Sequence, residues 1–154
     1  MKLLVFSDSH GQADKMLKAI EQGAPDMIIH LGDAGRDIDK IKKQFPQIPL
    51  KAVRGNCDFS SDLPETELFS VGKVKLFITH GHVFTVKRTL APLIDEAISL
   101  GVNIVMFGHT HAAISSMVGG LYVLNPGACG GFFPSCAEVS IDSKGEIICR
   151  IVNL

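Results

Sequence analysis

Short apolar runs alternate with amphipathic segments along the first third of the chain. Residues 2–7 ("KLLVFS"), 26–31 ("DMIIHL") and 49–54 ("PLKAVR") are short, apolar and bounded by polar residues, which is typical of buried strands. Residues 12–22 and 36–45, which lie between them, carry apolar residues at helical spacing. The order strand, helix, strand, helix, strand predicts parallel βαβ units with right-handed crossovers. The predicted apolar face of the first helix consists of Ala13, Met16, Leu17 and Ile20.

The pattern changes in the second half of the chain. Residues 65–72 and 73–80 lie on either side of Gly72-Lys73, which predicts a hairpin. Residues 89–100 then favour a helix with Thr89 as its N-cap and Gly101 at its end. The predicted apolar face of this helix consists of Leu90, Leu93, Ile94, Ala97 and Ile98.

Only strands and turns are predicted after this helix. Residues 102–107 form another buried run. Further strands are predicted over 113–118, 121–125, 137–141 and 146–152. The whole chain, residues 1–154, is therefore expected to form one α/β domain with two packed sheets and helices outside.

Composition narrows the class of protein. The chain is 46% hydrophobic and 20% charged, which excludes an intrinsically disordered chain. The net charge of −1 and the lack of a basic stripe leave no electrostatic footprint for nucleic acid. The first apolar run breaks at Ser7 and Asp8, too early for a signal peptide or a membrane span. We expect a cytoplasmic protein whose four cysteines, which show no CxxC spacing, are free thiols.

Polar side chains follow five of the predicted strands at the point where each strand ends. Taken singly, an aspartate, asparagine or histidine at such a place is a turn residue, a cap or a hydrogen-bonding group. Those readings do not explain why all five strand ends carry metal-ligand types. Because ligands bind beyond the carboxyl ends of strands, and residues i and i+2 of an extended segment point the same way, we expect all seven to converge on one edge of the sheet. The seven are Asp8, His10, Asp33, Asn56, His80, His109 and His111.

The types of donor atom limit which metal ions could bind. Oxygen and nitrogen donors without a thiolate disfavour a structural zinc site of the cysteine type. Seven ligands exceed the needs of one tetrahedral ion but suit two divalent ions that share a carboxylate. We expect manganese first, with nickel, iron, zinc or cobalt as alternatives. Two such ions about 3.5–4 Å apart clamp the attacking and leaving oxygens of a displacement at phosphorus and make hydroxide available near neutral pH.

The motifs occur in a familiar order. "DSH", "GD", "GNCD", "HGH" and "GHTH", followed by "NPG" at residues 125–127, resemble the calcineurin-like metallophosphoesterases, and in particular their small single-domain phosphodiesterase branch. The resemblance implies a four-layer α/β/β/α sandwich with two mixed sheets and a dinuclear metal site at the carboxyl-terminal edge of the strands.

The resemblance also implies a role for each ligand. Asp8, His10 and His111 would hold the first ion, and Asn56, His80 and His109 the second. Asp33 would bridge the two ions. Gly108 is expected to let the backbone approach the metals closely.

The identity of the general acid stays open. The wider superfamily commonly has a histidine after the asparagine of the "GN" motif, where this chain has Cys57. A thiol can donate a proton, although its hydrogen bond is weak. His82, two residues beyond His80, is the alternative donor, or else a supporting or surface residue. His30 is expected to pack or to orient a ligand, and Asp58 to cap or orient. The predicted catalytic residues are therefore Asn56, His80, Cys57 and His82.

The function predicted from these observations is a metal-dependent phosphodiesterase acting on a phosphodiester small molecule or nucleotide-type substrate. One alternative is a protein-interaction scaffold like the retromer subunit of this fold, which has lost part of its metal site; the complete ligand set favours the enzyme. Another is a phosphomonoesterase, which the scarcity of nearby basic residues disfavours, since Arg36 and Arg54 are the nearest. We expect an open site and, from base rates alone, a homodimer.

Overall fold

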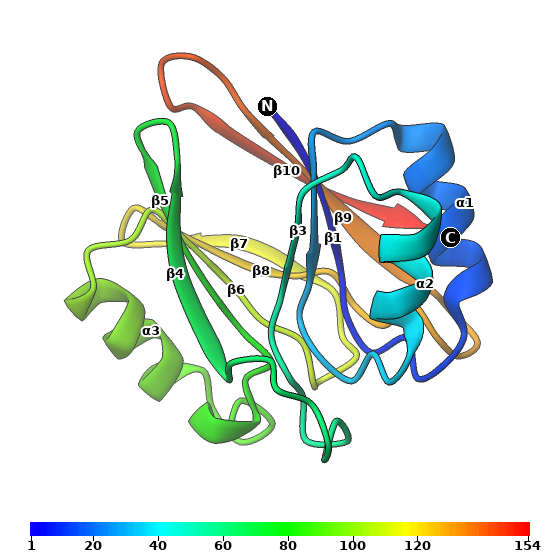
Figure 1. The fold of residues 1–154 in the computed structure, drawn as a ribbon. Coiled ribbons are helices and arrows are strands. Elements are labelled where there is room, and N and C mark those ends of the chain that lie inside the picture. Colours follow the sequence, from blue (N-terminus) through cyan, green and yellow to red (C-terminus); the bar gives the residue numbers. More distant parts are fainter.

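Two five-stranded sheets make up the centre of the computed structural model, which describes residues 1–154 (Figure 1). The first sheet has the order β10-β9-β1-β2-β3, and the second has the order β4-β5-β6-β8-β7. The strands of the first sheet are β1 (Lys2–Phe6), β2 (Met27–His30), β3 (Leu50–Ala52), β9 (Ser135–Ile141) and β10 (Ile147–Asn153). Those of the second are β4 (Thr66–Val71), β5 (Val74–Thr79), β6 (Ile104–Met106), β7 (Ile114–Val118) and β8 (Leu121–Asn125).

Alternation of side chains along the strands explains the layers. In β1, Leu3 and Val5 point into the cluster between the sheets, whereas Leu4 and Phe6 pack against the helices on the outside. The helices α1 (Ala13–Gly23) and α2 (Asp37–Gln44) cover the outer face of the first sheet, and α3 (Ala91–Ser99) covers that of the second (Figure 1). The result is the expected four-layer α/β/β/α sandwich.

Both sheets are mixed, and each contains a parallel set. In the first, β1, β2 and β3 run parallel; in the second, β5, β6 and β8 do. The loops after the parallel strands gather at the lower end of the molecule in Figure 1, below the gap between the sheets. A 3₁₀ turn, η1 (His82–Phe84), lies at this end and was not predicted.

The predicted strands and helices are all present, and their ends lie within two residues of the predicted ones. Three details were wrong. Leu90, not Thr89, is the N-cap of α3; the Thr89 hydroxyl instead accepts the Ala91 N–H at 3.2 Å. Ile98 is 60% exposed, because it falls at the margin of a narrow apolar face centred on Leu93 and Ala97. The ligand-bearing strand ends also belong to two sheets rather than to one edge.

No helix of this structure has both the length and the apolar character needed to cross a membrane. All four cysteines are free, as expected.

Candidate metal centre

The seven predicted ligands meet where the two sheets adjoin. Asp8 and His10 follow β1, Asp33 follows β2, and Asn56 follows β3. The second sheet contributes His80 after β5, and His109 and His111 after β6. Three overlapping groups of possible ligating atoms lie within 4.8 Å of one another: Asp8, His10 and His111; Asp8, Asp33 and His80; and His10, Asp33 and Cys57.

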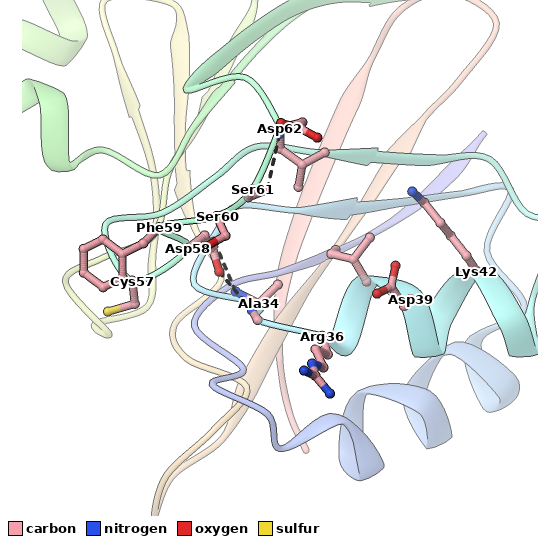
Figure 2. Close-up of a pocket in the computed structure, with 13 residues that line it drawn as sticks. Ala34, Arg36, Asp39, Lys42, Cys57, Asp58, Phe59, Ser60, Ser61 and Asp62 are labelled. Carbon is pink, nitrogen blue, oxygen red and sulfur yellow. Dashed lines mark hydrogen bonds between the residues drawn. The ribbon is translucent and has the colours of Figure 1, made fainter.

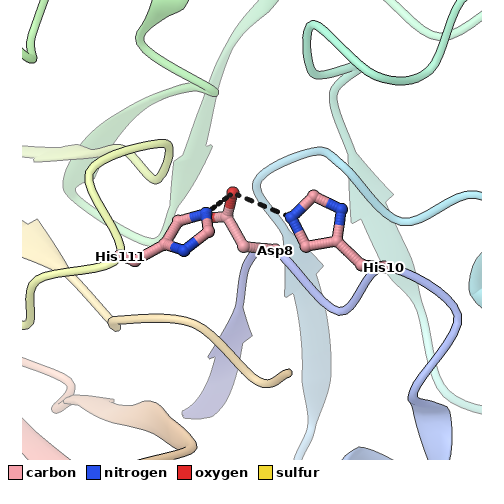
Figure 3. Close-up of side chains that lie close together, drawn as sticks. All are labelled: Asp8, His10 and His111. Carbon is pink, nitrogen blue, oxygen red and sulfur yellow. Dashed lines mark ion pairs between the residues drawn. The ribbon is translucent and has the colours of Figure 1, made fainter. Parts of the chain in front are cut away.

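The Asp8 carboxylate is the buried centre of the first group. Figure 3 shows the rings of His10 and His111 on either side of it. Its Oδ1 lies 3.1 Å from His111 Nε2 and 3.9 Å from His10 Nε2. Its Oδ2 accepts hydrogen bonds from the Ser7 hydroxyl at 2.6 Å and from the His109 N–H at 3.0 Å. One oxygen is therefore fixed by the protein and the other points into the site.

The His80 ring organises the second group. Its Nδ1 lies 2.8 Å from the carbonyl oxygen of Leu31, which can only accept, so Nδ1 donates the proton. Nε2 then faces the site, where Asn56 Oδ1 and His109 Nδ1 are each 3.1 Å away. The histidine tautomer is thus set by the backbone, in the way that metal-binding histidines require.

Asp33 lies between the two groups. Its Oδ2 is 3.5 Å from His80 Nε2 and 3.9 Å from His10 Nε2. Its Oδ1 accepts the Cys57 N–H at 2.8 Å, which fixes the orientation of the carboxylate. The position is suited to a carboxylate that serves both ions.

The backbone at these ligands is not extended. Positive φ angles occur at five of the seven: Asp8 (55°), His10 (47°), Asp33 (54°), His109 (66°) and His111 (59°). The expectation that residues i and i+2 point the same way because the segment is extended was therefore wrong. The pairs converge because left-handed residues turn the chain back over the strand ends.

Two glycines allow the loops to come this close. A Cβ on Gly108 would lie 1.8 Å from Ser7 Oγ and 2.9 Å from Asp8 Oδ2. A Cβ on Gly55 would lie 2.0 Å from Asp33 Oδ1. Gly108 is thus required for close approach to Ser7 and the candidate ligand Asp8, and its expected effect on the distance to the metals stays a prediction.

Asp58 orients the loops around Asp33, as the sequence suggested. Its Oδ2 accepts the N–H groups of Asp33 (2.7 Å) and Gly55 (2.8 Å), and its Oδ1 accepts that of Gly35 (2.9 Å). These backbone donors lower the pKa of Asp58 against the opposing effect of burial. The negative charge is therefore used to tie the loops after β2 and β3 together.

His30 also has a supporting role. The ring is fully buried, and burial lowers its pKa to about 4, so it is neutral. Its Nδ1 accepts the Gly32 N–H and its Nε2 lies 3.2 Å from the Ser9 hydroxyl. It joins the loops after β1 and β2 through these two contacts.

Sequence reasoning missed two supporting residues. Ser7 holds Asp8 Oδ2, and Asn125, the first residue of "NPG", donates through Nδ2 to the Gly108 carbonyl and to Thr110 Oγ1, both at 3.0 Å. Asn125 thereby shapes the loop that carries His109 and His111. The conspicuous "NPG" motif was a signal for this residue, but its partner could not be read from the sequence.

Both candidate proton donors lie near the cluster. The His82 ring is centred 5.4 Å from that of His80 and 6.2 Å from that of His109, and its pKa is lowered by burial and by His80. The pKa of the Cys57 thiol is raised by its hydrogen bond to Asp33 and by burial.

The donor set fits divalent metal ions. Asp8 Oδ1 is a buried carboxylate oxygen with no hydrogen-bond donor. Near His80 Nε2 lie two oxygens that can only accept, Asn56 Oδ1 at 3.1 Å and Asp33 Oδ2 at 3.5 Å. Such a convergence of acceptors is costly unless a cation lies among them.

Comparison with known proteins agrees with this reading. Residues 1–142 match the model of the calcineurin-like phosphoesterase superfamily domain. The chain is 34% identical over 131 residues to the probable metallophosphoesterase YsnB of Bacillus subtilis, covering 83% of this chain and 75% of that protein. It is 28% identical over 152 residues to the phosphodiesterase YfcE of Escherichia coli K12, covering 83% and 79%.

A solved structure shows the same architecture. Vps29 of Entamoeba histolytica, in complex with Zn²⁺, superposes with a TM-score of 0.79 at 25% identity, covering 99% of both chains. The family uses divalent metals, and its members named as phosphodiesterases support a hydrolase. On the family match, the fold and the relatives together, this chain belongs to the calcineurin-like phosphoesterase superfamily.

Proposed function

We propose that this protein is a phosphodiesterase with two divalent ions, of which manganese is the first candidate, at the junction of the two sheets. Asp8, His10 and His111 would hold one ion, and Asn56, His80 and His109 the other. Asp33, whose Oδ2 lies between His10 and His80, would serve both. When bound, the ions would polarise the phosphate and lower the pKa of the attacking water.

The observation that carries this proposal is the buried, undonated Oδ1 of Asp8 within a complete set of ligand types. An oxygen buried without a donor destabilises the fold unless a cation binds it. The neighbouring protein groups prepare it for that role, because Ser7 and the His109 N–H engage the other oxygen of the same carboxylate.

The protein groups near the ions have defined tasks in such a reaction. The Leu31 carbonyl keeps the proton of His80 on Nδ1, so that Nε2 faces the site. Asp58 holds the loops that bear Asp33 and Asn56. Cys57 and His82, which lie near the candidate ligands, would be the groups that give a proton to the leaving oxygen, and Asn56 and His80 would orient the phosphate near the second ion.

The test is metal analysis followed by turnover. The protein is stripped, reloaded with Mn²⁺, Ni²⁺, Fe²⁺, Zn²⁺ or Co²⁺, and assayed with bis(p-nitrophenyl) phosphate and with p-nitrophenyl phosphate. We expect two ions per chain and faster hydrolysis of the diester. Faster hydrolysis of the monoester would overturn the phosphodiesterase assignment.

Matched variants separate the site from general stability. Asp8→Asn and Asp37→Asn both alter a fully buried carboxylate that has one undonated oxygen, but only Asp8 belongs to the ligand set. Asp8→Asn should lose metal and activity, whereas Asp37→Asn should keep both if it folds. A wild-type chain that binds no metal and hydrolyses neither substrate would favour an interaction scaffold of this fold.

A further inference from the structure

An open cleft of about 690 Å³ lies between α2 and the loop 57–63. In Figure 2, Cys57 and Phe59 stand at one end of this cleft and Lys42 at the other. Cys57 also belongs to the ligand cluster, because its Sγ lies within 4.8 Å of ligating atoms of His10 and Asp33. The cleft therefore begins at the candidate metal centre and leads away from it.

Phe59, at the inner end of the cleft, is 90% exposed. Among the nine phenylalanines of the chain only Phe132 and Phe133 are comparably exposed, at 98% and 94%, and the other six are at least partly buried. A phenyl ring left in water contributes nothing to the core. Phe59 instead presents a free aromatic face to whatever occupies the cleft.

The rest of the cleft lining combines apolar, acidic and basic side chains, which restricts the chemical class of ligand that fits. Ile38 and Leu63 supply apolar surface, while Asp39 and Asp62 supply carboxylates. Arg36 and Lys42 also line the cleft, and neither takes part in a salt bridge. The cleft thus offers hydrogen-bond donors and acceptors of both charges beside one aromatic face.

We propose that this cleft binds the nucleoside arm of a phosphodiester substrate, with the base stacked on Phe59. The inference rests on the phosphodiesterase function proposed above and names its substrate class. Sugar hydroxyls and base N–H groups can donate to Asp39 and Asp62, and base carbonyls can accept from Arg36 or Lys42. A purely apolar arm would make none of these contacts. The volume lies within the roughly 300–1,000 Å³ of small-molecule sites.

Three diesters that share a p-nitrophenolate leaving group test the proposal: the methyl, phenyl and thymidine 5′ esters of p-nitrophenyl phosphate. Because the bond that breaks is the same, the ratio of kcat/KM values reports the other arm. We expect the thymidine ester to exceed the methyl ester about tenfold, the lower end of what base–aromatic stacking supplies. Phe59→Ala should bring this ratio near one, and Phe59→Tyr should restore it.

A control variant lies at the opposite end of the molecule. Ile148 is 56% exposed on β10 and is paired with Ser140, which in turn faces Lys2 at the start of β1. Ile148→Ala should leave all three rates unchanged. Equal kcat/KM for the methyl and thymidine esters in the wild type, or an equal loss for all three in Phe59→Ala, would overturn the proposal.

Binding supplies a readout that does not depend on turnover. Calorimetric titration with thymidine 5′-monophosphate should give a Kd about tenfold weaker for Phe59→Ala than for the wild type and Phe59→Tyr. An unchanged Kd, or a loss seen only in a Phe132→Ala/Phe133→Ala double variant, would refute the assignment to Phe59. If no diester is hydrolysed with any metal, the phosphodiesterase proposal fails, while the titration still decides whether the cleft binds a nucleotide.

Discussion

At the scale of single residues, the candidate centre depends on left-handed backbone conformations that residues other than glycine rarely adopt. Five of its seven ligands have positive φ, and all five are aspartate or histidine, which tolerate this region better than most residues. Each such position costs roughly 1–3 kcal/mol, so the surrounding structure must hold it in place. The hydrogen bonds of Ser7, Asp58 and Asn125 provide that support.

Asp33 should be the most damaging ligand to lose, because it is the one placed to serve both ions. Asp33→Asn keeps an oxygen that can accept the Cys57 N–H, so the loop should stay ordered. We expect activity to fall by more than about a hundredfold, beyond the loss typical of groups that only support a ligand. Metal content per chain and circular dichroism check this. Two bound metals with near-normal turnover would contradict the bridging role.

Mutation should show that the two histidines of "GHTH" bind different ions. His111 Nε2 lies 3.1 Å from Asp8 Oδ1, whereas His109 Nδ1 lies 3.1 Å from His80 Nε2. His111→Ala should therefore weaken the binding of one ion, and His109→Ala the binding of the other, although the two residues are only two positions apart. Anomalous scattering from crystals of each variant identifies the emptied position. Loss of the same ion in both variants would refute the split.

Cys57 should make proton delivery to the leaving group poor. Nitrophenyl esters need little protonation and should turn over well, whereas alkyl diesters should react slowly. Where general acid catalysis operates it contributes roughly 10²–10⁴-fold, so Cys57→His should accelerate alkyl leaving groups most. The measurement is log rate against leaving-group pKa for both proteins. A shallow slope that is the same in both would mean that an acid, such as His82, is already present.

At the scale of elements, the site is made by loops that two sheets bring together. Gly108 lies at the tightest of these contacts, because a Cβ at this position would be only 1.8 Å from Ser7 Oγ. Gly108→Ala should destabilise the fold by about 1–3 kcal/mol, as overpacking does, and should weaken metal binding by moving Asp8. Denaturant unfolding and metal titration measure the two effects. Adding Ser7→Ala should recover part of the stability, and no recovery would place the strain elsewhere.

The elements themselves could largely be predicted from the sequence. Periodicity reveals whether a segment is a strand or a helix, and Gly72-Lys73 marks a hairpin, because these signals are local. The assignment of strands to sheets is not local: β9 returns from residue 135 to pair with β1. For that reason the ligand-bearing strand ends were expected at one edge, and their division between two sheets was not.

The same limit applies to the site. The seven candidate positions could be named because each follows a strand and carries a ligand type, and their role as ligands stays a prediction. The supports could not, since Ser7 and Asp58 act on groups that only the folded chain brings near. The left-handed backbone could not be predicted either, because nothing in the spacing of "DSH" or "GHTH" distinguishes a turned segment from an extended one.

At the scale of the whole molecule, bound metal should stabilise the fold. An ion that binds only the folded state adds about 2.7 kcal/mol at a concentration a hundred times its Kd. For a chain of this size that corresponds to a rise in Tm of roughly 5–10 °C. Thermal unfolding with and without Mn²⁺ measures the shift, with Asp8→Asn as the control that should show little. An equal shift in both proteins would place the metal outside the proposed centre.

The origin of the ligands in both sheets has a mechanical consequence. Asp8 follows a strand of one sheet, and His109, 101 positions later, follows a strand of the other. Ions held among these loops would act as a removable crosslink, closing a long stretch of chain at one end of the sandwich. The two halves would then be fastened by metal at one end and by the apolar cluster along their length. Metal supply would set how firmly the halves resist being pulled apart, in addition to whether the site can react.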